Sequence, residues 1–166
     1  WDVQCGLGKP SIAAVGGAAR GGGMTLAISC DLILAAESAT FGYPEIDLGL
    51  LPAIHLSHLP RLIGRPRAFE LLFSGRTFSA IEAERIGLVN RCTVDSGLLR
   101  SAAEMATGFA SKPPNAIRAA RTALVRASDR GYRDDIAKAV DDFCTTATSV
   151  STQKRLRSFL ENRQSS

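Results

Sequence analysis

The chain has 166 residues, of which 45% are hydrophobic and 22% charged, a composition typical of one globular domain and unlike a disordered segment. Its net charge of +4 comes from the C-terminal part, where 11 basic and 6 acidic residues follow position 111; solvated faces of amphipathic helices explain this excess, and attraction of a phosphate-bearing ligand is the alternative. No basic stripe interleaved with aromatics indicates nucleic-acid binding, and no apolar run approaches the roughly 18 residues of a membrane helix.

The first part of the chain alternates short apolar runs with glycine-rich turns. Residues 11–15 and 32–36 predict buried strands, and residues 39–42 predict a third, shorter strand. A short helix is expected between the first two strands, over residues 22–30. This order predicts an α/β fold with nearly continuous apolar strands.

Two features of this part can carry chemistry. Gly21, Gly22 and Gly23 precede the expected helix, and glycines there let backbone N–H groups approach a ligand and hold a developing oxyanion. Glu45 follows a proline in an apolar neighbourhood, where a carboxylate can act as a general base. The alternative for Glu45 is a structural acid, and for Gly22 a packing turn.

The second part of the chain predicts helices. A helix over residues 65–73 is expected to turn Phe69, Leu72 and Phe73 inward, and Ser79 with Glu82 forms a capping box for the next helix. A strand over 88–93 and a helix over 97–110 follow, and the chain is helical from Pro113 onward. We divide the chain into an α/β part, residues 1–94, and a helical part, residues 95–166.

Cysteine and histidine spacing does not indicate a metal site. The four cysteines form no CxxC pair, and Cys30 and Cys144 are expected in the core of a protein from a reducing compartment, most simply the cytoplasm. His55 and His58 could share a helix face, but no further ligands stand at suitable spacing. His55 is a candidate pocket residue or an ordinary helix residue.

Several segments, in this order, resemble the enoyl-CoA hydratase/isomerase (crotonase) superfamily over essentially the whole chain. They are residues 9–15 (KPSIAAV), 17–27 (GAARGGGMTLA), 30–36 (CDLILAA), 41–52 (FGYPEIDLGLLP), 73–89 (FSGRTFSAIEAERIGLV) and 158–163 (SFLENR).

The resemblance implies the C-terminal portion of a β-β-α spiral with a helical trimerisation region, assembled as a homotrimer or a dimer of trimers. It implies an acyl-CoA thioester substrate, with coenzyme A as part of the substrate and no separate cofactor, metal, membrane or nucleic acid. An enolate would be held by two backbone N–H groups, of which Gly22 carries one. The other donor, and much of the CoA pocket, would belong to a segment before Trp1.

The resemblance also assigns the catalytic carboxylates. Family hydratases use two glutamates; Glu45 matches one, and Thr25 stands where the other is expected. A threonine hydroxyl can hold a water but cannot act as a base near neutral pH, whereas moving a proton between carbons needs one base. Thr25 therefore favours isomerisation or another enolate reaction over hydration. A helix-face residue bonded to its own backbone is the alternative for Thr25.

The remaining site residues follow from the same resemblance. Gly23, Ala53 and His55 are expected to line the substrate pocket. Ala53 and His55 belong to the segment after Pro52, which lacks the glycine-rich run of the family. Phe159 and Arg163 are expected to bind CoA, although Asn162 replaces a common lysine.

Two hypotheses of different class remain. In one, the protein is an acyl-CoA enzyme that isomerises or hydrates an enoyl-CoA through Glu45. In the other, the chain is a truncated or degenerate family member that only folds and self-associates. Binding of an acyl-CoA separates the two.

Overall fold

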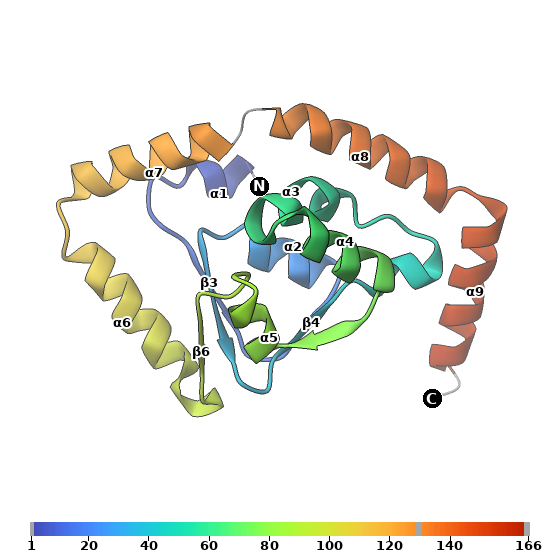
Figure 1. Ribbon diagram of the computed structural model, residues 1–166, viewed down its shortest axis with the longest axis horizontal. Coiled ribbons are helices and arrows are strands. Elements are labelled where there is room, and N and C mark those ends of the chain that lie inside the picture. The colour runs from blue at the N-terminus through green and yellow to red at the C-terminus, as the bar shows by residue number, and fades with distance from the viewer. Residues whose placement is uncertain (1, 129–130, 165–166) are drawn as a thin grey trace. The chain divides into compact units, whose positions relative to one another are not determined.

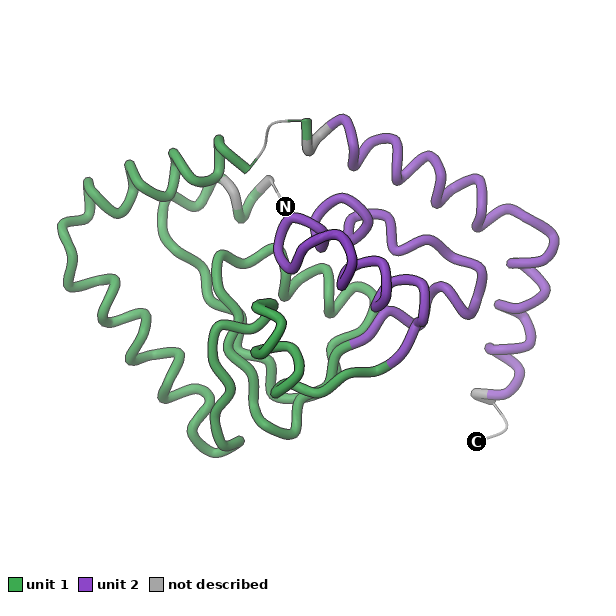
Figure 2. Tube along the Cα trace, in the orientation of Figure 1, with its two compact units in different colours: residues 1–41, 77–131 green, residues 42–76, 132–166 purple. Residues whose placement is uncertain are grey.

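The computed structural model describes residues 2–128 and 131–164, apart from the side chains of residues 2, 5, 132, 133, 163 and 164. The chain forms two compact units, each built from segments distant in the sequence (Figure 1, Figure 2). Unit 1 contains Trp1–Phe41 and Thr77–Gly131, and unit 2 contains Gly42–Arg76 and Tyr132–Ser166.

The main sheet of unit 1 is parallel and has the strand order β1-β3-β6. Its strands are β1 (Ile12–Val15), β3 (Leu32–Ala36) and β6 (Arg91–Thr93). Strand β3 is central and has the predicted bounds, and four of its five residues are buried. A continuous apolar run is stable as a strand covered on both faces, which explains why this element was predictable.

A second, smaller sheet has the order β2-β4-β5. It consists of β2 (Ala18–Ala19), β4 (Thr40–Gly42) and β5 (Thr77–Ser79). The buried Phe41 ring of β4 and Phe78 ring of β5 stack with centroids 5.8 Å apart. Strand β2 was not predicted, because a two-residue strand is defined by its partner rather than by its own pattern.

The helices of unit 1 include those predicted over residues 22–30 and 97–110, after Ser79, and from Pro113 onward. They are α1 (Asp2–Gly6), α2 (Gly22–Ile28), α5 (Ala80–Arg85), α6 (Leu98–Ala110) and α7 (Pro114–Ser128), with a 3-10 turn η2 (Asp95–Gly97) before α6. The expected cap of α5 is present: Ser79 Oγ accepts a hydrogen bond from Glu82 N at 3.1 Å. The strand expected over 88–93 is shorter than predicted and begins at Arg91.

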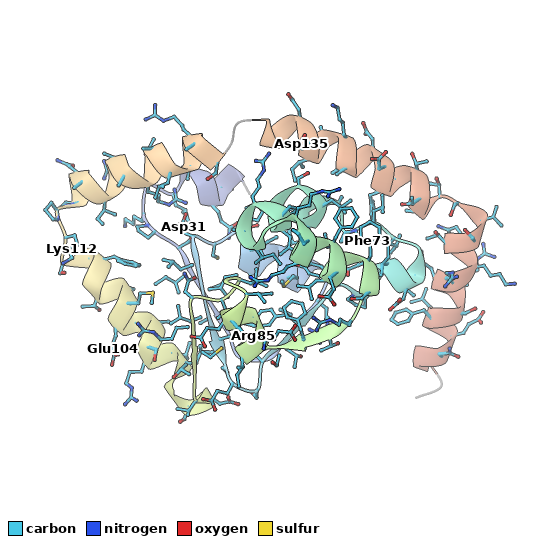
Figure 3. All side chains as sticks on the ribbon, in the orientation of Figure 1. Asp31, Phe73, Arg85, Glu104, Lys112 and Asp135 are labelled. Carbon is cyan, nitrogen blue, oxygen red and sulfur yellow. The ribbon has the colours of Figure 1, made fainter. Side chains whose placement is uncertain are left out.

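One carboxylate connects three elements of unit 1. Asp31, just after α2, accepts hydrogen bonds from Ser11 N at 2.7 Å and Ser11 Oγ at 2.8 Å, at the start of β1. Arg121 of α7, only 7% exposed, donates from Nε to the same carboxylate at 3.0 Å. Figure 3 labels Asp31 among the side chains of this unit. The carboxylate therefore holds the strand start and the helix together.

Unit 2 is helical. It contains a 3-10 turn η1 (Pro44–Leu48) and the helices α3 (Ala53–Ile63), α4 (Arg65–Ser74), α8 (Tyr132–Ala147) and α9 (Val150–Gln164). Helix α3 packs against α4 and α8, and Arg61 pairs with Asp135 at 3.1 Å across the α3–α8 contact. Glu45 therefore lies in a short helical turn.

The expected inward face of α4 was wrong in two of three residues. Leu72 is buried, but Phe69 is 48% and Phe73 60% exposed (Figure 3 labels Phe73). These two rings stack on each other with centroids 4.7 Å apart, while Ala68 and Leu71 join Leu72 inside. These three aliphatic residues form the buried face of α4, and the aromatic pair lies on its outer face.

The cysteine expectation also needs correction. Cys144 is exposed and Cys30 is half-buried, so neither is a core residue. In α8 the buried position is taken by Ala139, which is 6% exposed. In the described part of the chain, no helix is both long and apolar enough to cross a membrane.

Candidate active site

The glycine triplet begins helix α2 in the expected way. Gly21 has φ 49°, a conformation that favours glycine, and Gly22 is the first residue of the helix. Gly23 N donates to Arg20 O at 2.9 Å, and Met24 N to the same oxygen at 3.4 Å. Among the described residues none accepts a hydrogen bond from Gly22 N, so this amide is available to a ligand.

Arg20 fixes the turn before α2, and sequence reasoning missed it. Its guanidinium donates to Ala19 O at 2.9 Å, to Thr40 O at 2.7 Å and Thr40 Oγ1 at 3.1 Å, and to Thr77 Oγ1 at 3.2 Å. These contacts bind all three strands of the smaller sheet. A side chain whose partners lie up to 57 positions away leaves no local signal in the sequence.

Thr25 lies one turn into α2. It is half-buried, and its Oγ1 donates to Gly21 O at 3.3 Å within the same helix. This is the backbone bond that the alternative interpretation of Thr25 expected. A lining role in the site stays a prediction.

Glu45 lies in the turn η1, whose backbone is held in place by hydrogen bonds within unit 2. Leu50 N donates to Glu45 O at 3.0 Å, and Arg155 of α9 donates to Asp47 O at 3.0 Å. Glu45 Oε2 is buried and has no hydrogen-bond partner within the described residues. A buried carboxylate oxygen without a partner is positioned to receive a proton or a donor group.

The end of η1 is held by a residue that has to be glycine. Gly49 has φ 79°, and a Cβ atom there would lie 2.5 Å from Thr152 Oγ1. Thr152, 2% exposed on α9, donates from Oγ1 to Gly49 O at 3.0 Å. Thr152 was also missed, since nothing in its own sequence neighbourhood points to a partner 103 positions away.

Tyr43 and His55 lie beside each other in unit 2. Tyr43 is 0% and His55 2% exposed, and their rings meet edge to face with centroids 4.8 Å apart. Burial, and then the neighbouring charge of His58, lower the pKa of His55 from 6.5 to about 4. Burial first, and then the charge of Glu45, raise the pKa of Tyr43. At neutral pH the site therefore contains a neutral imidazole and a protonated phenol.

The other predicted residues of unit 2 lie on α3 and α9. Ala53 is the first residue of α3 and is half-buried. Phe159 is 42% exposed and lines a groove of about 550 Å³ with Asp47, Arg155 and Asn162, among others. The Arg163 side chain is outside the described residues, and its expected contact with CoA stays a prediction.

The candidate residues fall in both units. Unit 1 contains Gly22, Gly23 and Thr25, and unit 2 contains Tyr43, Glu45, Ala53, His55 and Phe159. Within the described residues, no group of three or more His, Cys, Asp or Glu side chains could hold a metal ion.

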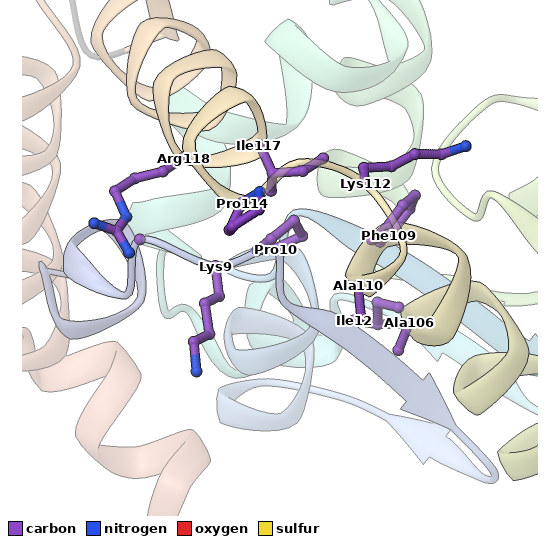
Figure 4. A pocket seen from close by; sticks show the side chains of 11 residues that line it. Lys9, Pro10, Ile12, Ala106, Phe109, Ala110, Lys112, Pro114, Ile117 and Arg118 are labelled. Atoms are coloured by element: carbon purple, nitrogen blue, oxygen red, sulfur yellow. The ribbon is translucent and has the colours of Figure 1, made fainter.

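Unit 1 also has a cavity of its own, of about 320 Å³, between β1, α6 and α7 (Figure 4). Its apolar lining includes Pro10, Ile12, Phe109 and Ile117. Lys112 extends away from this apolar centre in Figure 4. None of the predicted site residues lines this cavity.

Comparison with known proteins identifies the family. The family model described as "Enoyl-CoA hydratase/isomerase" matches residues 1–166, and the chain belongs to this family. It is 38% identical over 164 residues to "Probable enoyl-CoA hydratase echA8" of Mycobacterium leprae, covering 98% of this chain and 64% of that protein. It is 36% identical over 163 residues to "Short-chain-enoyl-CoA hydratase" of Clostridium acetobutylicum, covering 95% of this chain and 61% of that protein.

Solved structures agree with the family assignment. The enoyl-CoA hydratase/isomerase of Pseudoalteromonas atlantica matches with a TM-score of 0.88 and 27% identity, over 97% of this chain and 65% of that chain. The predicted fold class, part of a crotonase-like α/β fold, is therefore confirmed. The chain spans less than two thirds of the length of these relatives.

Proposed function

We propose that the protein acts on an acyl-CoA thioester, stabilises its enolate and moves a proton with one glutamate, Glu45. Membership of the enoyl-CoA hydratase/isomerase family supports this proposal. The observation that carries it is the buried Glu45 Oε2, a basic oxygen with no hydrogen-bond partner in the described part of the chain. Coenzyme A enters as part of the substrate, and no separate cofactor is required.

The proposed division of labour follows from the two kinds of group. Gly22 N–H, the first amide of α2, is one donor to the thioester oxygen as negative charge develops there. In isomerisation, Glu45 takes a proton from the carbon next to the thioester, the double bond shifts, and the same carboxyl returns the proton two carbons further along. In hydration, Glu45 takes a proton from the attacking water and delivers it to that first carbon.

Of the two reactions, the presence of Thr25 favours isomerisation over hydration. Its hydroxyl donates to Gly21 O, and a threonine cannot serve as a second base at neutral pH. Gly23, Ala53 and His55 are proposed to line the acyl pocket, and Phe159 with Arg163 to bind the CoA part. We further propose a homotrimer or a dimer of trimers, and a cytoplasmic location in keeping with the bacterial relatives.

Replacement of Glu45 tests the proposal. In the complete protein, Glu45→Gln is expected to lower kcat by about 10²-fold or more on a panel of 2-enoyl-CoA and 3-enoyl-CoA substrates, because the amide cannot accept a proton. Steady-state kinetics with each substrate measures the loss and identifies the reaction.

Glu104→Gln is the matched control, since it makes the same replacement at an exposed position of α6 and is expected to leave kcat close to wild type. Unchanged turnover in Glu45→Gln would remove Glu45 from the mechanism. A wild-type protein that neither binds nor turns over any acyl-CoA would favour the non-catalytic alternative.

A further inference from the structure

Unit 2 contains a polar cluster of Tyr43, Glu45 and His55, in which Tyr43 contacts the His55 ring and is influenced by the charge of Glu45. Proton transfer by Glu45 alone leaves Tyr43 without a role. Tyr43 is 0% exposed, and its hydroxyl oxygen has no hydrogen-bond partner in the described part of the chain. Glu45 Oε2, two residues further along the chain, is also buried and has no hydrogen-bond partner among the described residues. Leaving a buried polar group unsatisfied destabilises the fold, so two such groups within three residues of the chain indicate a function.

The two groups are complementary. A phenol supplies one O–H donor, and an ionised carboxylate only accepts. The negative charge of Glu45 is close enough to contribute to the raised pKa of Tyr43, after burial itself, so the phenol keeps its proton. The Tyr43 hydroxyl therefore remains a donor, and the ionised Glu45 carboxylate can accept from it.

His55 keeps this cluster free of a competing positive charge. Its ring packs edge to face on Tyr43, and burial, followed by the charge of His58, lowers its pKa to about 4. At neutral pH the imidazole is uncharged and adds no positive charge beside Tyr43. The ring contact also fixes the plane of the Tyr43 ring, and hence the position of its hydroxyl.

We propose that Tyr43 is a positioning residue for Glu45, whose hydroxyl donates a hydrogen bond to the Glu45 carboxylate across one bridging water. The two oxygens are not in direct hydrogen-bond contact. A water between them would satisfy both. The bond orients Oε2 and stabilises the anionic form that accepts the substrate proton. Tyr43 keeps its own proton throughout. This inference rests on the proposed role of Glu45.

Tyr43→Phe in the complete protein tests the inference, because it keeps the ring and its packing on His55 and removes one oxygen. The expected result is a kcat about tenfold lower with KM changed less than about twofold, since a donor to the base acts on the chemical step. The acid limb of the kcat/KM profile is expected to move to higher pH, because the carboxylate anion loses a donor. Tyr132→Phe removes the chain's other phenolic hydroxyl and is the matched control.

The double variant separates positioning from a general structural role. If Tyr43 acts through Glu45, adding Tyr43→Phe to Glu45→Gln changes the residual kcat by less than about twofold. A tenfold loss of kcat on adding Tyr43→Phe both to wild type and to Glu45→Gln would overturn the inference, and so would a change in KM alone. An unchanged kcat in Tyr43→Phe with an impaired Glu45→Gln would overturn it while the proposed function stands. Wild-type kcat in both single variants would overturn the inference and the proposed function together.

Discussion

At the scale of single residues, the neutral state of His55 couples the site to pH. The side chain is 2% exposed and packs on Tyr43, so a positive charge on it would lose most of its hydration. Burial is the larger cause of its lowered pKa, and repulsion from His58 adds to it. As a consequence, the His55 imidazole takes up a proton at a higher pH in the unfolded chain than in the folded one.

We predict that His55 makes the protein less stable as the pH falls from 6.5 to about 4. The pKa of His55 is about 4 in the folded chain and 6.5 as the ordinary value, so in that window the unfolded state binds more protons. The free energy of unfolding therefore decreases toward acid, by at most about 3.5 kcal/mol at ~1.4 kcal/mol per pH unit. Urea unfolding at a series of pH values measures this slope.

His55→Gln is expected to flatten the slope, because a glutamine does not titrate. His58→Gln is the control: it removes the chain's other imidazole and is expected to leave most of the slope in place. Equal slopes in wild type and His55→Gln would show that other groups govern the acid sensitivity.

At the scale of elements, the contact between Asp31 and Arg121 attaches α7 to the main sheet of unit 1. The Arg121 guanidinium is 7% exposed and also donates to Gln4 O of α1. The Asp31 carboxylate forms an ion pair with Arg121 and also accepts hydrogen bonds from the backbone N–H and the hydroxyl of Ser11. Removing one member of such a nearly buried pair leaves the other uncompensated.

We predict that Arg121→Met lowers the free energy of unfolding by about 2 kcal/mol, since methionine keeps the length of the side chain but leaves the Asp31 carboxylate and Gln4 O short of a donor. Arg126→Met, at an exposed position of the same helix, is expected to stay within about 0.5 kcal/mol of wild type. Denaturant unfolding of both variants provides the comparison. Equal stabilities would mean that α7 is held by apolar packing alone.

The elements also show what could be predicted from the sequence and why the rest could not. Strand β3 and the cap of α5 were predictable, because an apolar run and a Ser-x-x-Glu pattern act locally. Strand β2 and the turn η1 were not, since each depends on a partner segment. Phe69 and Phe73 were placed wrongly, because helical spacing alone does not say which face is covered.

The candidate site divides in the same way. Gly22 and Glu45 were found through motifs whose residues are close together in the sequence. Arg20, Tyr43 and Thr152 were missed as site residues because their roles come from contacts made in the folded chain. Arg20 forms hydrogen bonds to three strands, Tyr43 packs its ring against His55, and Thr152 donates a hydrogen bond to Gly49 O. Their partners can be found only when the packing of each unit is known.

At the scale of the whole molecule, the helical end of the chain carries apolar side chains that the described residues leave uncovered. Phe159 and Leu160 stand next to each other on α9 and are 42% and 58% exposed. Scattered exposed apolar residues are ordinary, but an adjacent pair on a helix proposed to mediate trimer formation is a candidate contact. Burial of such a pair in a subunit interface would be worth several kcal/mol, at about 25 cal/mol for each Å² removed from water.

We predict that Leu160→Lys weakens self-association of the complete protein. A lysine near the C-terminal end of α9 suits the helix itself, so the variant is expected to fold, while its charge opposes burial in an interface. Sedimentation velocity at micromolar concentration is expected to show a shift from the assembled species to smaller ones. Ile81→Lys on α5 is the matched control, because Ile81 is 62% exposed and lies outside the helical part proposed to associate. An unchanged sedimentation profile in Leu160→Lys, or an equal shift in both variants, would place the association surface elsewhere.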